Sequence, residues 1–418
     1  MVKQHFIETY GVPDWTAGFG GSGGSLQLLQ IAQDYPGLLD GIIANRTLPD
    51  APTLVPLELD CSVLAHYFSA PQVPWTTDQR AAVEGFLNPG TCDQTFSNLT
   101  GVSLPSVCPP AVPAAAIYDA TTNPDGVRCD VFDSMVNVYG RNPLTGFANR
   151  FWGNVGVQYG LEALLDGRIS GEQFLDLNER VGGLDVDGGF VSRRTPIDAP
   201  AVRTAYSTGR ISDGRGGLLD VPILDLRPWD DVNPADPHIS RMSLILRGRL
   251  DQAAGGHAGN YAYWVAPPQN SAATLQPFLD VEKLAMDTMG RWLDAIAADT
   301  SARTARQKVA AHRPADAADA CFTSDGARHE GSVTLGGGNF CSTTFPAASF
   351  PRLVAGAPPT DDILQCQFEA VRAEDYNGKL TPDQLERLRR IFPRGVCDYG
   401  RPSQNASRFL GTWISFGG

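Results

Sequence analysis

A short glycine-rich segment near the start of the chain contains the residue best suited to covalent chemistry. The segment Gly20-Gly-Ser-Gly-Gly24 matches the pattern G-x-S-x-G, with Ser22 at its centre. In that pattern the serine occupies a sharp strand-to-helix turn, where flanking side chains would clash with neighbouring backbone. The turn raises the hydroxyl above the sheet edge, and the N–H of Gly23 can donate to a developing oxyanion. The motif therefore predicts Ser22 as a nucleophile in acyl transfer.

The same glycines allow two other interpretations, a dinucleotide-binding loop and a purely structural turn. Residues Gly18 to Gly23 can be aligned with G-x-G-x-x-G, but Asn45 stands near the place where that fold needs an acidic residue. A phosphate-binding loop would need Gly-Lys-Ser or Gly-Lys-Thr, which the segment lacks. The nucleophile interpretation fits best, and a nucleotide-binding oxidoreductase is kept as a rival.

A serine nucleophile needs a base and an acid that orients the base, usually in the chain order serine, acid, histidine. The apolar run 221–226 is followed by Arg-Pro-Trp-Asp-Asp, so we expect Asp230 or Asp231 to be the acid. His238 lies in the same loop and is the first candidate for the base, and His257, in a glycine-rich turn, is the second. Either aspartate could instead cap the next helix, and either histidine could be an exposed or capping side chain.

Helices and strands alternate in the segments that must position these residues. Around Ser22 the order helix, strand, glycine turn, helix, strand predicts a βαβ unit with parallel strands. The serine and the proposed acid would then both follow the carboxyl ends of strands. The predicted helices cover residues 2–10, 25–35, 157–182 in two pieces, 238–254, 278–298 and a segment that begins at 381; the predicted strands cover 15–19, 38–44, 221–226 and 261–266.

Composition divides the chain into three parts. Residues 1–50 and 218–300 carry the strand and helix patterns and form the expected α/β core, with a mostly parallel sheet of the α/β-hydrolase type. Residues 51–217 form the expected cap or lid, because residues 50–150 are rich in proline, glycine and cysteine with only short periodic stretches. Residues 301–418 return to loops and cysteines, and we expect an extension packed on the core.

Eight cysteines, an even number with no C-x₂-C zinc spacing, favour disulfides and hence an oxidising compartment. We therefore expect a secreted or periplasmic protein. Nearness in sequence suggests the pairs Cys92–Cys108, Cys321–Cys341 and Cys366–Cys397, which would leave Cys61 for Cys129.

The charge of the chain restricts its partners. The 418 residues include 33 Lys and Arg against 46 Asp and Glu, a formal net charge of −13. Nucleic acids and anionic membrane surfaces need basic patches, and a membrane span needs an apolar run of about 18 residues, which is absent. We expect a small-molecule or oligomeric ester as the partner, with no nucleic acid and no membrane, and the motif implies no metal or cofactor.

A resemblance to a known family is carried by the stretches 20–27, 31–43, 154–161, 174–178, 222–227 with Asp236-Pro-His238, and 395–399. These stretches resemble secreted bacterial proteins related to tannases and feruloyl esterases, in a branch of unknown function that is loosely akin to hydroxybutyrate-oligomer hydrolases. The resemblance implies a serine hydrolase of carboxylic esters that acts through an acyl-enzyme, and it leaves phenolic esters, hydroxyalkanoate oligomers and synthetic polyesters open.

Two departures from the family pattern matter. Tannase-like enzymes join a cysteine before the nucleophile to one after the base, but here Gly21 precedes Ser22 and no His-Cys pair exists. The family fold also builds several strands before the serine turn, whereas only a short segment precedes it here. We therefore expect an N-terminally truncated piece that lacks those strands and one oxyanion donor, and is inactive or slow. A non-catalytic binding or scaffold protein on a hydrolase frame is a further rival.

Overall fold

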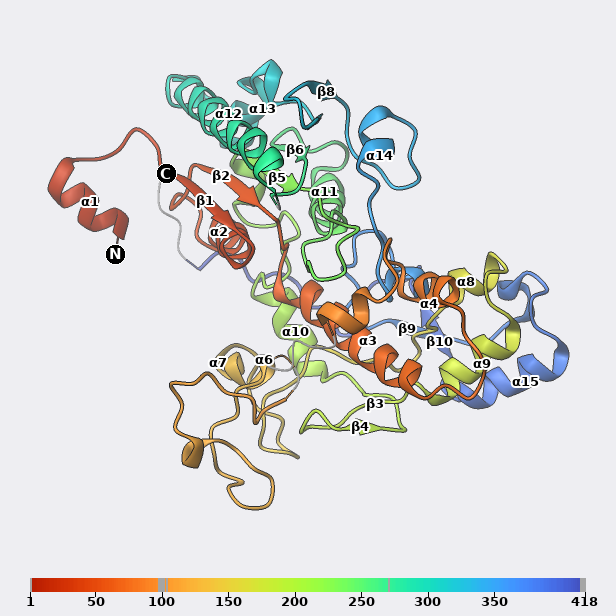
Figure 1. Cartoon of the computed structure of the whole chain (residues 1–418). Helices are drawn as coiled ribbons and strands as arrows, with labels where there is room; N and C mark the ends of the chain where they lie inside the picture. The colour runs from red at the N-terminus through yellow and green to blue at the C-terminus, as the bar shows by residue number, and fades with distance from the viewer. Residues whose placement is uncertain (1, 97–101, 103, 270, 414–418) are drawn as a thin grey trace.

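The computed structural model describes residues 2–96, 102, 104–269 and 271–413, and a six-stranded sheet lies at its centre (Figure 1). The strand order is β1-β2-β5-β6-β7-β8, and neighbours run parallel except β7 and β8. The chain is therefore an α/β protein with a mostly parallel sheet. The strands are β1 (Ala17–Gly21), β2 (Gly41–Asn45), β5 (Ile223–Pro228), β6 (Tyr261–Ala266), β7 (Ala320–Phe322) and β8 (Arg328–Glu330).

Helices cover both faces of this sheet (Figure 1). Ile42 and Ala44 of β2 pack into the core on one face, with α2 and α11, whereas Ile43 packs with α12 and α13 on the other. Parallel strands covered on both faces consist of almost continuous apolar residues, and all six residues of β6 are buried. The covering helices are α2 (Gly23–Asp34), α11 (Arg241–Ala254), α12 (Ala272–Ala297) and α13 (Ala305–Ala311).

The strands and helices predicted around Ser22 are confirmed, with boundaries shifted by a few residues. β1, α2 and β2 form the expected βαβ unit, and β5 and β6 continue the parallel sheet. The sheet also extends farther than the sequence pattern indicated, because β7 and β8 come from residues 320–330, within the segment expected to be an extension. These two strands are only three residues long, too short for a visible periodicity.

A second, helix-rich body packs beside the sheet around one large apolar core. It combines residues 51–217 with residues from about 355 to 399, so segments far apart in the chain share this core. Its elements are α3 (Ala51–Ser69), α4 (Thr77–Glu84), α6 (Val131–Ser134), α7 (Val136–Tyr139), α8 (Leu161–Leu165), α9 (Gly171–Arg180), α10 (Ala199–Ser207), α15 (Pro382–Ile391), and the short pairs β3 (Gly183–Leu184) with β4 (Phe190–Val191) and β9 (Gln367–Glu369) with β10 (Val396–Asp398).

The long helix α3 is the clearest difference from the sequence analysis, which expected only short periodic stretches in this segment. The helix is buried on nearly every side, so it shows no alternation of apolar and polar faces. It also contains Pro56, which normally argues against a helix interior. Asp50 caps its first turn by accepting a hydrogen bond from the N–H of Thr53.

Capping boxes open several of the other helices. Ser170 with Gln173 opens α9, and Thr381 with Gln384 opens α15. At the N-terminus, α1 (Val2–Tyr10) has no buried residue and projects from the body of the molecule (Figure 1). Among the described residues, none of the helices combines the length and apolar character that crossing a bilayer requires.

Four disulfides join the eight cysteines. The predicted pairs Cys321–Cys341 and Cys366–Cys397 are confirmed, and the other two predictions are wrong. Cys61 lies on α3, and this helix packs against the short helical turn that begins at Cys92. Distance along the sequence does not reveal that contact. The two remaining pairs are Cys61–Cys92 and Cys108–Cys129.

Candidate active site

Ser22 lies at the turn between β1 and α2, in a backbone conformation that few side chains adopt. Its φ of 55° and ψ of −119° place it outside the ordinary regions for an L-residue. The N–H of Ser22 still pairs with the carbonyl of Asn45, at 2.9 Å, so the sheet holds the strained residue in place. Ser22 as a whole is half-buried.

Two glycines before Ser22 stand where the structure leaves no room for a Cβ atom, whereas Gly23 and Gly24 have open space around that position. A Cβ atom on Gly20 would lie 2.8 Å from the carbonyl carbon of Gly24, closer than side-chain atoms tolerate. A Cβ atom on Gly18 would lie 2.3 Å from a methyl group of Leu28. The first turn of α2 therefore packs directly on β1, and this contact produces the sharp bend at Ser22.

Ser25 fastens the turn from inside the helix. Its hydroxyl donates to the carbonyl of Ser22 at 2.6 Å and accepts from the N–H of Leu48 at 3.0 Å. This buried side chain links the serine turn to the segment after β2. Gly23 is the first residue of α2, so its N–H belongs to the helix end where backbone donors lack intrahelical partners. These donors and the helix dipole favour negative charge beside Ser22.

His238 is the histidine that the fold brings to Ser22. Its Nε2 atom lies 2.8 Å from the Oγ atom of Ser22, and its side chain is 17% exposed. The second candidate, His257, is 66% exposed and lies 3.8 Å from Asp251. The loop after β5 therefore places the imidazole of His238, the first candidate from the sequence, next to the Ser22 hydroxyl.

A different carboxylate from those expected contacts the imidazole. The Oδ1 atom of Asp236 lies 2.6 Å from Nδ1 of His238 and also accepts the backbone N–H of His238 at 2.8 Å. One oxygen thus fixes both the backbone and the ring of the residue two positions later, in the manner of an Asx turn. Asp236 sits where the sequence analysis had placed Asp230 or Asp231.

Asp230 and Asp231 have other partners in the same loop. Asp231 is buried and accepts hydrogen bonds from the N–H and hydroxyl of Ser240 and from the N–H of Ala348. Asp230 accepts from the side-chain amide of Asn233 at 2.8 Å. The sequence analysis took the first carboxylates after the strand, whereas the loop turns once more before a carboxylate contacts the ring. The triplet Asp236-Pro-His238 was the available signal.

The half-buried Asp236 and the buried Asp231 differ in the direction in which their pKa values are shifted. Burial acts to raise the pKa of Asp236, but the hydrogen bonds and charge of His238, with a smaller contribution from Arg46, bring it below its ordinary value. Burial raises the pKa of Asp231 to about 6, although its N–H and hydroxyl donors oppose the rise. Asp236 is therefore ionised at neutral pH, as an acid that orients a protonated imidazole must be.

Arg227, which the sequence analysis did not single out, holds the histidine loop. It is fully buried at the end of β5, and its guanidinium donates to the carbonyl of His238 at 3.0 Å. The same group donates to the carbonyl of Thr47 and the hydroxyl of Ser243, both at 2.8 Å. It thus joins the loop to the segment after β2. A charged residue next to a buried apolar strand was the signal in the sequence.

A second strained residue stands beside Ser22. Gly21 pairs in register with Asn45, so Arg46 follows β2 at the level where Ser22 follows β1. Arg46 has a φ of 49°, in the left-handed region that non-glycine residues rarely occupy. The amide of Asn45 donates to Glu282 of α12 at 2.8 Å. The carboxyl ends of two neighbouring strands therefore both carry constrained polar residues, which is typical of a functional site.

The fold and these contacts define an α/β protein with a serine, a histidine and an aspartate joined in one hydrogen-bonded line. The chain belongs to the tannase-like family of unknown function (DUF6351), which matches residues 1–408. Membership in a tannase-like family indicates a hydrolase of the esterase type, without specifying its substrate. No curated protein and no solved structure matches the chain.

Proposed function

We propose that this protein is a serine hydrolase that cleaves carboxylic esters through an acyl-enzyme on Ser22. The observation that carries the proposal is the line of hydrogen bonds from the Ser22 hydroxyl through His238 to Asp236, at 2.8 and 2.6 Å. A nucleophile within reach of a base that is itself oriented by an acid is the arrangement that acyl transfer uses on unrelated folds.

In the first half of the reaction, the Oγ atom of Ser22 attacks the acyl carbon of the ester. Its proton passes to Nε2 of His238, and the carbonyl oxygen becomes an oxyanion. Asp236 accepts the Nδ1–H of the imidazolium and stabilises its charge. The imidazolium then protonates the alkoxide that leaves, and an acyl-Ser22 ester remains.

In the second half, water replaces the alcohol. His238 takes a proton from the water, the hydroxide attacks the acyl carbon, and the bond to Ser22 breaks as its oxygen is reprotonated. The backbone N–H of Gly23 would donate to the oxyanion in both halves, because it opens α2 directly after the nucleophile. No step of this mechanism draws on a metal or a cofactor.

The substrate class follows from the family rather than from the geometry. Phenolic esters, hydroxyalkanoate oligomers and synthetic polyesters all present an acyl carbon to such a site. Four disulfides support a secreted or periplasmic location, because such bonds persist in oxidising compartments.

The experiment compares two histidine variants in the hydrolysis of p-nitrophenyl butyrate. H238A should lower kcat by at least about 10³-fold, since the base is lost. H257A is the matched control, because His257 is exposed and its charged neighbour is Asp251 rather than Ser22. This variant should retain wild-type activity. Equal activity of the two variants, or a wild type that hydrolyses no ester while a ligand still binds near Ser22, would favour a non-catalytic protein.

A further inference from the structure

Strand β5 carries two charged side chains, although all six of its residues are buried. Asp225 and Arg227 are two positions apart, so their side chains leave the strand on the same face of the sheet. Neither side chain is exposed. Burying charges costs free energy, and well-packed apolar residues in their place often stabilise a fold equally well or better. Two buried charges next to the candidate active site therefore indicate a role beyond packing.

Thr47, two residues after β2, forms hydrogen bonds with both charged side chains. Its hydroxyl donates to Asp225 at 2.7 Å, and its carbonyl accepts from Arg227 at 2.8 Å. The hydroxyl of Tyr261, on β6, also donates to Asp225 at 2.6 Å. Burial raises the pKa of Asp225, and the charge of Arg227 and these two hydroxyls oppose the rise. Thr47 is itself fully buried, so β5 holds the segment after β2 by its backbone and by a side chain.

The same segment holds the nucleophile. Leu48 donates its N–H to the hydroxyl of Ser25 at 3.0 Å, and that hydroxyl donates to the carbonyl of Ser22 at 2.6 Å. The N–H of Ser22 pairs with the carbonyl of Asn45 at 2.9 Å. Both backbone groups of Ser22 are therefore connected to residues 45–48, one directly and one through Ser25.

Arg227 connects this segment to the base. Its Nη1 atom donates to the carbonyl of His238 at 3.0 Å, while Nη2 donates to the carbonyl of Thr47. Nη2 also donates to the hydroxyl of Ser243 on α11 at 2.8 Å, which fixes the guanidinium from a third side. Because the N–H of His238 donates to Asp236, both backbone groups of the histidine are held as well.

Residues 47–48 lie between the two reacting groups. In the sheet, β2 is the strand between β1 and β5, so the loop after β5 must cross the end of β2 to bring His238 within 2.8 Å of Ser22. Ser25 joins residues 47–48 to the nucleophile, and Arg227 joins them to the base. Two short chains of hydrogen bonds with one common anchor thus span the distance between the serine and the histidine.

We propose that Arg227 is a positioning residue for His238, and that residues 47–48 are the common anchor that sets the distance between nucleophile and base. The inference rests on the proposed function, because it assigns a role in the same reaction. A displacement of about 1 Å can slow a reaction about 10²-fold. Loosening either connection should therefore slow the chemical step and leave substrate binding nearly unchanged.

The first test is R227K, which keeps the positive charge but lacks the planar fork that reaches three acceptors at once. Two rates are measured below the unfolding transition: kcat for p-nitrophenyl butyrate and the rate at which a fluorophosphonate labels Ser22. Each should fall by about 10- to 10²-fold, while KM changes by less than about twofold.

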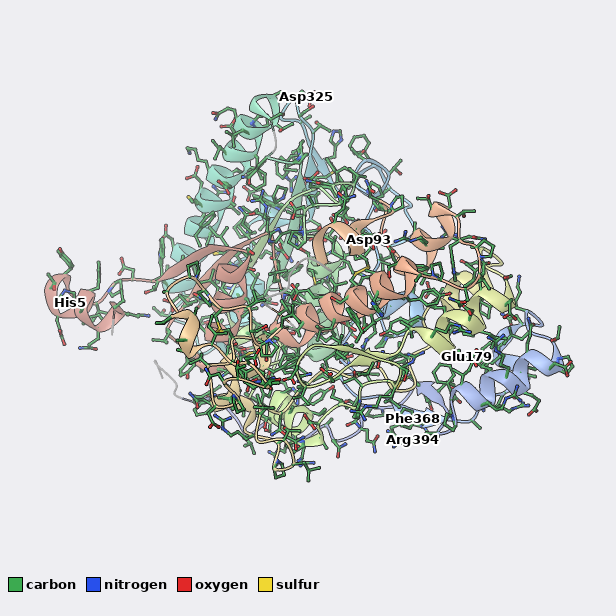
Figure 2. All side chains as sticks on the ribbon, turned by 60° about the horizontal axis from the view of Figure 1, so that its bottom comes forward. His5, Asp93, Glu179, Asp325, Phe368 and Arg394 are labelled. Atoms are coloured by element: carbon green, nitrogen blue, oxygen red, sulfur yellow. A yellow bond between two sulfur atoms is a disulfide. The ribbon has the colours of Figure 1, made fainter. Side chains whose placement is uncertain are left out.

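R352K is the matched control, because Arg352 is also buried and donates to several acceptors, but in the helix-rich body. It should lower the unfolding midpoint and keep the wild-type labelling rate. R394K replaces an exposed arginine at the periphery of the molecule (Figure 2) and should change neither quantity.

S25A tests the other connection and should slow labelling by about tenfold. No hydrogen bond joins Ser25 to Arg227 in the described part of the chain, and the effects of independent sites multiply. Because both residues act on one distance, the S25A/R227K double variant should lose less than the product of the two single losses.

Two results would overturn the inference and leave the proposed function intact: wild-type labelling rates in R227K or S25A, or a double-variant loss equal to the product. An R352K variant that slows labelling as much as R227K would also overturn it, since general destabilisation would then explain the effect. S25A decides the question alone if R227K does not fold. A wild type that neither hydrolyses the ester nor becomes labelled would overturn the proposed function and this role of Arg227 together.

Discussion

The sheet and the helix-rich body beside it are stabilised in different ways. The sheet consists of short buried apolar strands covered by helices on both faces, and one disulfide, Cys321–Cys341, joins β7 to α14 (Phe340–Thr344) next to it. The helix-rich body has shorter elements and longer irregular segments. It contains two disulfides, Cys108–Cys129 and Cys366–Cys397, and a third, Cys61–Cys92, fastens its long helix α3.

Buried ion pairs occur in both regions, since Arg249 of α11 pairs with Asp50 and Arg352 pairs with Asp60. Asp60 of α3 accepts two hydrogen bonds from Arg352, and further hydrogen bonds from Trp152 and Tyr159. Breaking such a pair by removing one partner is strongly destabilising, because a buried charge is left alone. The comparison shows two ways of holding a chain in place: regular strands position Ser22 and His238 at their carboxyl ends, and disulfides constrain the irregular body.

The largest expected effect tests whether ester hydrolysis depends on Asp236, on the sheet side of the molecule. D236N should lower kcat for ester hydrolysis by about 10³- to 10⁴-fold, because an amide no longer holds His238 in the reactive tautomer. Its unfolding midpoint should change little. Steady-state kinetics and thermal unfolding measure the two quantities.

D231N is the matched control for that variant, since Asp231 belongs to the same loop but contacts Ser240 and Ala348 rather than the ring. It should cost about 1–3 kcal/mol of stability, because one of its donors would then face an amide N–H₂ group. If D231N loses more activity than D236N, then Asp231 rather than Asp236 orients His238, as the sequence analysis first expected.

The second prediction concerns the cross-links of the helix-rich body. Replacing Cys61 and Cys92 by alanine opens a loop with a sequence separation of 31 and should lower the free energy of unfolding by about 2–4 kcal/mol. The hydrogen bonds among Ser22, His238 and Asp236 lie elsewhere, so kcat below the unfolding transition should stay near the wild-type value. Urea unfolding and kinetics on the same samples give both numbers. A variant as stable as the wild type would show that α3 does not need its cross-link.

The third prediction concerns the pH dependence of stability that arises within α3. Burial raises the pKa of Glu58 from an ordinary value near 4.5 to about 8. Because the folded state holds this proton more tightly than the unfolded state, the stabilising effect is complete below about pH 4.5 and is lost as the pH rises towards 8. The wild type should therefore be less stable at about pH 8 than at about pH 5.

E58Q should reduce this decline, since a neutral amide does not titrate. Part of the decline should persist, because burial also raises the pKa of Glu84 to about 7. Urea unfolding at the two pH values measures the slope. If E58Q and the wild type lose the same amount of stability between the two pH values, Glu58 is not the group responsible for the decline.

The sequence predicted the sheet side of the molecule well for a physical reason. Apolar runs, a glycine turn and helix formers are local signals, and they located β1, α2, β2, β5 and β6 together with the contact of His238 and Ser22. The helix-rich body carries few local signals. Its helix α3 is buried all round, and the pairing of Cys61 with Cys92 depends on a contact that only the folded chain makes.

The carboxylate that contacts His238 could not be chosen by its position in the chain. Asp230, Asp231 and Asp236 occupy one loop, and only its turns decide which carboxylate reaches the ring. The role of Arg227 was also hard to predict, because its hydrogen bonds join two segments that are far apart in the chain.

The central claim, that Ser22 is an activated nucleophile, is tested most directly by labelling with a fluorophosphonate. The wild-type chain is treated with the reagent, digested and mapped by mass spectrometry. The account predicts one covalent adduct, on the peptide that contains Ser22, and strongly reduced labelling in H238A. An unlabelled Ser22, or a label whose yield is the same with and without His238, would contradict it.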